Sequence, residues 1–220
     1  MGAGGDFPID LVILGGIALF LVLRLRSILG RREGFERPTE APQPMPAATM
    51  PPSAAAPATP APATRVVPDP SSAIGQVLMQ MTQLDANFRS DRFLDGAEGA
   101  FRIIVTAFAA GDRVRLHPLL SDDTYRAFET AIAAREAAGE TQRTEIHAIP
   151  AATIEDATLH DRTAAITVRL VSDQVNITHD STGAPVVGTD AVTEITDLWT
   201  FERVLGTADP TWRLVAARSA

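Results

Sequence analysis

Hydrophobic residues recur at helical spacing over residues 91–112 of the chain. Residues three or four apart lie on one face of an α-helix. Those that share this face are Phe93, Ala97, Phe101, Ile104 and Phe108. Gly111 predicts the end of the helix, because glycine readily adopts the left-handed conformation found there. Glycines and alanines at 96, 97, 99 and 100 make one side of the helix thin, so we expect another segment to pack close to it.

Residues 71–84 form a second, shorter stretch of helical period, with Ser71 or Ser72 available as the N-cap. Its apolar face consists of Ile74, Val77, Leu78, Met81 and Leu84. A helix that lies on a membrane usually carries basic residues on its polar face, and this one has none. We therefore expect it to dock on its own domain or to pair with a second copy in a homodimer.

A third helix is predicted from Ser121, which can cap it, to Ala138, where Gly139 ends it. Tyr125, Phe128 and Ile132 continue at helical spacing along it. From residue 141 the period changes to two, which indicates strands over residues 141–149, 153–159, 163–178, 186–187, 193–204 and 212–217. Residues 179–183 read as a hairpin turn.

This order of helices followed by strands predicts an α+β fold with an antiparallel sheet. A bent sheet wrapped round the helices would form a cone and bury both apolar surfaces. The folded part is expected over residues 85–220, after the short helix at 71–84.

The N-terminal part contains an apolar tract at residues 9–29, after a tail of residues 1–8. At ~1.5 Å per residue such a tract spans a ~30 Å hydrocarbon layer. The proposed anchor residues are Ile9, Leu11, Val12, Ile13, Leu14, Ile17, Leu19, Phe20, Leu21, Val22 and Leu23. A secretory signal would have basic residues before the tract, whereas here the acidic Asp6 and Asp10 precede it, so we favour a retained transmembrane anchor over a signal or a buried core helix.

The uncharged core of this tract is residues 11–23, and basic residues follow it only on its C-terminal side, at Arg24, Arg26, Arg31 and Arg32. The positive-inside rule then places the N-terminus outside and the folded part in the cytoplasm or an equivalent compartment. The localisation expected for a bacterial protein is the inner membrane, crossed once.

Residues 30–70 read as a linker, because eleven prolines lie between Pro38 and Pro70 and no apolar period accompanies them. Its extended reach approaches ~100 Å at ~3.1 Å per residue. A PxxP ligand near residues 57–60 is the less favoured alternative to a spacer.

Charge and composition narrow the function. The chain has 19 basic and 27 acidic residues, and from Ser71 onward 13 arginines face 21 acids, a net charge of −8. An acidic domain is a poor binder of nucleic acid. The absence of cysteine and lysine from the sequence excludes cysteine nucleophiles, Schiff-base lysines and P-loops.

No catalytic or cofactor motif stands out in the sequence. The histidines at 117, 147, 160 and 179 have no metal-ligand spacing, so neither a metal nor a cofactor is predicted. Cone-shaped folds also host isomerases and hydratases that use an Asp and a Tyr. The single tyrosine, Tyr125, would need Asp112, Asp197 or His147 nearby for such chemistry. Asp197 could equally pair with Arg169 across two strands.

Several motifs resemble one family. They are FLDGAEGAFRIIVTAFAAGD at 93–112, LLSDDTYRAFETAIAAREAAG at 119–139, DLWTFER at 197–203 and PTWRL at 210–214. Together they are similar to the conserved domain of the peripheral, Tim44-type subunit of the mitochondrial inner-membrane presequence translocase, and most similar to its alphaproteobacterial membrane-anchored relatives, described as adaptors.

The resemblance covers residues 85–217 and implies a fold like the nuclear-transport-factor-two cone, with a pocket between helices and sheet and a scaffold role at a membrane. It does not carry over chaperone tethering, because that role belongs to a segment before the family's conserved domain. We therefore expect a non-enzymatic adaptor for protein partners, with a lipid- or small-ligand-binding domain as the alternative. The candidates for the pocket or partner surface are Phe93, Phe101, Phe108, Tyr125, Phe128, Val168, Leu170, Trp199 and Phe201.

Overall fold

The computed structural model describes residues 63–220. The predicted anchor at 9–29, the arginines that set its orientation and most of the linker lie outside the described residues. Within residues 63–220, no helix is both long and apolar enough to cross a membrane.

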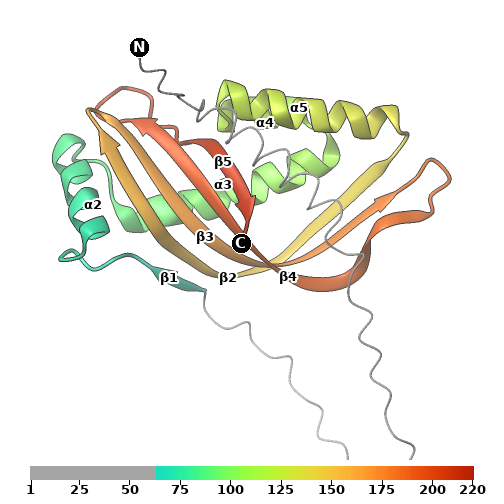
Figure 1. Cartoon of the computed structure of the whole chain (residues 1–220), viewed down its shortest axis with the longest axis horizontal. Coiled ribbons are helices and arrows are strands. Elements are labelled where there is room, and N and C mark those ends of the chain that lie inside the picture. Colours follow the sequence, from blue (N-terminus) through green and yellow to red (C-terminus); the bar gives the residue numbers. More distant parts are fainter. Residues whose placement is uncertain (1–62) are drawn as a thin grey trace, which may run out of the picture.

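The domain consists of a curved five-stranded sheet with helices on its concave side (Figure 1). The helical segments are α2 (Ala73–Leu84), α3 (Ser90–Ala110), α4 (Arg113–Leu116), η1 (His117–Leu119) and α5 (Asp122–Ala137). The strands are β1 (Thr64–Val66), β2 (Thr141–His160), β3 (Thr163–His179), β4 (Pro185–Val204) and β5 (Arg213–Ser219). The predicted α+β class and the cone-like arrangement are confirmed.

The strands follow one another across the sheet in sequence order. Neighbours from β2 to β5 are antiparallel, but β1 pairs in parallel with β2 through residues 151–153. The sheet is therefore mixed rather than wholly antiparallel. The prediction of a linker over 30–70 is also wrong at its end, because Thr64–Val66 joins the sheet.

The sequence signals at the helix ends act as expected. Ser121 accepts a hydrogen bond from the backbone N–H of Thr124 at the start of α5, and Ser72 does the same for Gly75 at the start of α2. Gly111 ends α3 with φ of 69°, the left-handed conformation that glycine tolerates best.

The short helix α2 docks on its own domain, the first of its two predicted alternatives. Leu78 and Met81 are buried in the same hydrophobic core as α3 and the sheet. Four residues of the apolar face proposed for a homodimer through residues 71–84 thus pack within the domain, namely Ile74, Val77, Leu78 and Met81, whereas Leu84 is exposed.

Strands predicted as separate pieces are continuous in the structure. Pro150 lies within β2, where the register with β3 shifts between Ala148 and Ala151, so the strand bends there without ending. Gly188 lies within β4 at φ of 95°, and a Cβ there would be 2.1 Å from the Asn176 carbonyl oxygen. These irregularities let long strands curve round the helices.

Aromatic pairs connect α3 with the other layers of the core. The ring centroids of Phe101 and Trp199 are 4.7 Å apart, and those of Phe108 and Phe128 are 5.1 Å apart. Six residues proposed for a pocket or partner surface are instead core residues with at most 4% of their surface exposed. They are Phe101, Phe108, Phe128, Val168, Leu170 and Trp199.

Strand β1 is held by a partly buried ion pair. The guanidinium of Arg65 donates to both carboxylate oxygens of Glu98 in α3, at 2.7 and 3.1 Å, and lies 2.9 Å from Asp95. Glu98 is buried, so its charge is compensated mainly by Arg65. Strand β1 is thereby fixed to the middle of α3.

Candidate functional site

An apolar groove of about 440 Å³ runs along α3, beside Phe93 and Ala97 of its buried face and over the exposed Gly96, Gly99 and Ile103. Its other wall comes from the β4–β5 loop, the end of β4 and Leu119 of η1. Residues of α3 line it from Arg92 to Ile103, and Ile103 is 45% exposed. The groove is therefore a surface feature that another molecule can reach.

The floor of the groove is the thin side of α3. Gly96 and Gly99 line it together with Ala97 and Ala100. A Cβ built on either glycine would meet no heavy atom within 4 Å. The expectation that another segment packs close is therefore wrong for the two glycines within the described part of the chain, where they border open space, whereas Ala97 is buried in the core and Ala100 packs against it.

Four aromatic rings build one end of the groove. Phe93 lies 4.8 Å from Trp212 and 6.1 Å from Phe201 between ring centroids, and Phe88 lies 5.9 Å from Trp212. Edge-to-face and tilted contacts at these distances are favourable beyond the burial of area alone. This end of the groove is consequently an apolar surface of closely packed aromatic rings.

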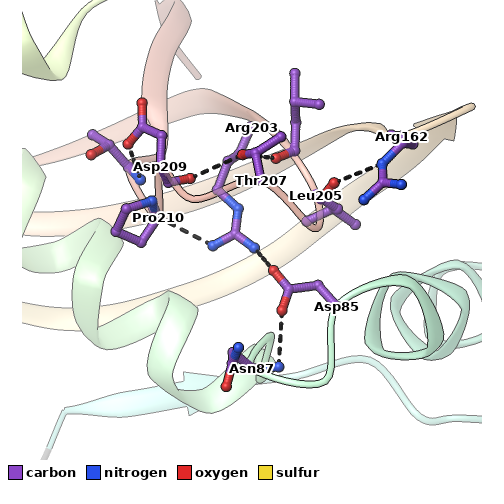
Figure 2. A network of polar contacts seen from close by, with 10 residues as sticks. Asp85, Asn87, Arg162, Arg203, Leu205, Thr207, Asp209 and Pro210 are labelled. Atoms are coloured by element: carbon purple, nitrogen blue, oxygen red, sulfur yellow. Dashed lines mark hydrogen bonds and ion pairs between the residues drawn. The ribbon is translucent and has the colours of Figure 1, made fainter.

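The position of the groove wall depends on Arg203 of β4 (Figure 2). Its guanidinium forms an ion pair with Asp85, just after α2, and donates to the carbonyl of Pro210 at 3.3 Å. It also lies over the Trp212 ring, 5.4 Å from the centroid. Only 11% of the Arg203 side chain and 9% of the Asp85 side chain are exposed. One side chain thus joins the α2–α3 connection to the β4–β5 loop.

The loop itself is held by Asp209. Its carboxylate accepts a hydrogen bond from the backbone N–H of Thr211 at 2.9 Å and pairs with Arg213 at 2.9 Å. Hydrogen bonds from the Thr211 backbone and hydroxyl, followed by Arg213, lower the pKa of Asp209 to about 2. This pKa lies below the ordinary value of 3.8 for an aspartate. The stabilisation of the fold by the ionised Asp209 is therefore complete above pH 3.8 and is lost as the pH falls toward 2. At neutral pH Asp209 is ionised and makes all of these contacts with Thr211 and Arg213.

The charges that line the groove are all positive, namely those of Arg89, Arg92 and Arg203. Arg89 pairs with Asp91 at 3.0 Å, and the hydrogen bond from Arg89, followed by that from the Arg92 backbone, lowers the pKa of Asp91 to about 2. Arg203 is paired with Asp85. Arg92 is exposed and forms no ion pair with any residue of the range 63–220.

Of the residues proposed from sequence for a pocket or partner surface, Phe93 and Phe201 do line the groove. The sequence analysis did not predict the other wall of the groove. Loop residues such as Trp212 show no periodic hydrophobic pattern that would indicate their packing beside α3. Arg92 could have been predicted as an exposed residue of this surface, since it lies in the first turn of α3 on the side opposite the apolar face.

Tyr125 lies elsewhere, half-buried, with its ring packed on His117 at 4.7 Å between centroids. Its hydroxyl forms no hydrogen bond with another described residue. Asp112 caps α4 and pairs with Arg115, while His147 is exposed beside Glu145. The tyrosine-centred acid–base arrangement considered from sequence thus does not form around Asp112 or His147.

Asp197 is fully buried on β4, on the same face of the strand as Trp199 and Phe201. Arg169 is exposed and forms its ion pair with Glu155, at 2.8 Å. The ion pair between Arg169 and Asp197 that the sequence suggested is not observed. Within residues 63–220 there is also no group of three or more His, Asp or Glu side chains that could hold a metal ion.

A chain of polar side chains crosses the sheet away from the groove. Arg135 of α5 donates to Gln142 at 2.5 Å, and Thr144 donates to Asn176 at 2.5 Å. Gln174 then donates to Ser172 at 2.5 Å. These polar groups have hydrogen-bond partners, so their burial fits a structural role that ties α5 to the end of the sheet.

The fold and the groove together define a cone-shaped α+β domain with an open apolar surface. Residues 74–219 match the Tim44-like domain, which is more than half of the chain. The protein belongs to this family, as its sequence motifs suggested. The match begins in α2, so this helix is part of the domain and not a separate element before residue 85. Family membership indicates a scaffold domain that interacts with proteins.

Two of the solved structures that resemble this chain are distant from it in sequence. The intermembrane space region of the chloroplast protein ARC6 is 10% identical, with a TM-score of 0.43, and the match covers 57% of this chain and 95% of that one. An NTF2-like family protein from Streptomyces avermitilis is 13% identical, with a TM-score of 0.35, over 60% of this chain and 96% of that one. A comparison with curated protein sequences gives no match.

The ion pair between Arg203 and Asp85 gives a direct prediction. Asp85→Ala leaves the buried guanidinium without its carboxylate, and we expect the free energy of unfolding to fall by about 3 kcal/mol. Chemical denaturation followed by tryptophan fluorescence measures it. Arg126→Ala is the control, because its pair with Asp123 is exposed and is expected to contribute about 0.5 kcal/mol or less. Equal losses in the two variants would contradict this role for Arg203 and Asp85.

Proposed function

We propose that this protein is a membrane-anchored adaptor that binds protein partners at the cytoplasmic face of the inner membrane, in membrane-protein biogenesis or complex assembly. The observation that carries the proposal is the open apolar groove along α3. Family membership supports a protein-binding role for it. The proposed function is non-catalytic.

The layout of the chain supports tethering. The apolar tract at 9–29 is proposed as the anchor and the proline-rich segment as the spacer that leads to β1. A tethered binder gains effective concentration within the volume that its linker sweeps. An enzyme acting on membrane lipid would gain little from a spacer between the bilayer and its active site.

Binding of a lipid or small apolar ligand is the second candidate. A volume of about 440 Å³ falls in the range of small-molecule sites, and the groove lining is mainly apolar. The groove's position on the surface of α3, with exposed glycine backbone and Ile103, favours a macromolecular partner because a lipid tail gains most from enclosure.

The proposed orientation has its own test. Because the arginines flank only the C-terminal side of the apolar tract, we expect residues 63–220 to be protected when protease is added to intact spheroplasts. Digestion after the membrane is permeabilised is the control. Digestion in intact spheroplasts would contradict the cytoplasmic placement.

Affinity capture after crosslinking in cells tests the adaptor role. We expect the full-length protein to retain a reproducible set of protein partners, and a variant that lacks residues 71–220 to lose them, since the groove lies in that part. The truncated variant controls for proteins that are recovered through the membrane segment alone. Recovery of lipid or a metabolite with no protein would overturn the proposal.

A further inference from the structure

Gly96 and Gly99 are glycines that the fold of the domain does not require. Both lie in the interior of α3, both are exposed, and neither has a positive φ. A Cβ would fit at either position with no atom within 4 Å. Glycine in a helix interior is less favourable than alanine by about 1 kcal/mol. The two residues therefore cost the helix stability without serving its packing.

What the glycines do provide is a flat floor to the groove. Gly96, Gly99, Ala100 and Ile103 follow one another at spacings of three, one and three, so they form one stripe along the helix. Small residues on such a stripe let a second helix pack close, with axes about 8 Å apart. The groove extends from Arg89 to Ile103, about 21 Å at 1.5 Å per residue, which matches about four turns of helix.

The walls argue against an extended peptide as the occupant. Binding of a strand by addition to a sheet needs an exposed strand edge along the site. This groove is bounded by α3, the β4–β5 loop, Leu119 and the end of β4, and β4 lies between β3 and β5 in the sheet, so it offers no free strand edge along the groove. A helix, whose backbone groups pair internally, has no such requirement.

The charge of the groove defines the polar part of the partner. Three arginines and no acidic residue line it, in a domain whose net charge from Ser71 onward is −8. Arg92, at the end of the groove nearest the start of α3, has no ion-pair partner among the described residues. A carboxylate of the partner beside Arg92 would complete this arrangement.

We propose that the groove binds an α-helical segment of a protein partner, with apolar side chains on one face and an acidic side chain at the Arg92 end. The inference rests on the proposed adaptor function and names the chemical class of its partner. The apolar face packs on Gly96, Gly99 and Ile103, and the aromatic end of the groove receives a larger side chain.

A displayed library of 16-residue helical peptides, selected on the full-length protein in nanodiscs, tests the proposal. We expect enriched peptides to share apolar residues at spacings of three and four and an acidic residue near one end. Fluorescence anisotropy of a selected peptide should show binding weakened at least ~10-fold by Gly99→Leu, which fills the groove. Arg92→Glu should weaken binding about fivefold, and reversal of the peptide's acid to arginine should restore it to this variant.

Two further variants separate a loss of binding from a loss of folding. Gly99→Leu occupies open space in a helix, so its unfolding midpoint should be no lower than that of the parent protein. Thr106→Leu, exposed on the same helix and outside the groove, should bind the peptide unchanged.

Three results would each overturn the inference. The selection could give no peptide whose binding depends on Gly99, or charge reversal at Arg92 could leave peptide binding unchanged. Anionic phospholipid vesicles could also displace the peptide from the groove. Capture of protein partners from cells that persists in the Gly99→Leu protein would also overturn it, while leaving the adaptor function intact. Failure to capture any protein with the parent chain would instead contradict the adaptor function.

Discussion

The packing of α3 against the sheet is the constraint on which the rest of the domain depends. One face of the helix places Phe93, Phe101 and Phe108 against aromatic partners from the sheet and from α5. Because this face fixes the rotation of the helix about its axis, the stripe that contains Gly96 and Gly99 must point away from the core. The groove is thus a direct geometric result of how α3 is buried.

The other wall of the groove is positioned by charge rather than by apolar packing. Arg203 joins residues that are far apart in sequence, Asp85 and Pro210, and supports the ring of Trp212. Ion pairs that are shielded from water require their partners to stay together, since an unpaired buried charge is costly. This requirement keeps the β4–β5 loop at a set distance from α3. Arg65 holds β1 on the opposite flank of α3 in a similar way.

The sequence predicted best what depends on local rules. The end of α3 at Gly111 and the start of α5 after Ser121 follow from backbone conformation and capping, and both were found. Strand β1 was missed, because three residues within a proline-rich segment pair only through a distant partner on β2. The glycines were recognised as a thin helix side, but whether a neighbour covers them depends on tertiary packing. The groove was half predicted, since Phe93 and Phe201 carry periodic signals whereas Pro210 and Trp212 do not.

The central claim is that the thin side of α3 is a protein-binding surface. A photocrosslinking amino acid placed at Ile103 in living cells tests this most directly, with Val192 as the matched control. Both side chains are exposed, at 45% and 54%, but only Ile103 lines the groove. We predict discrete protein adducts from position 103 and none of the same size from position 192. The same adducts from both positions, or adducts with lipid alone at position 103, would contradict the claim.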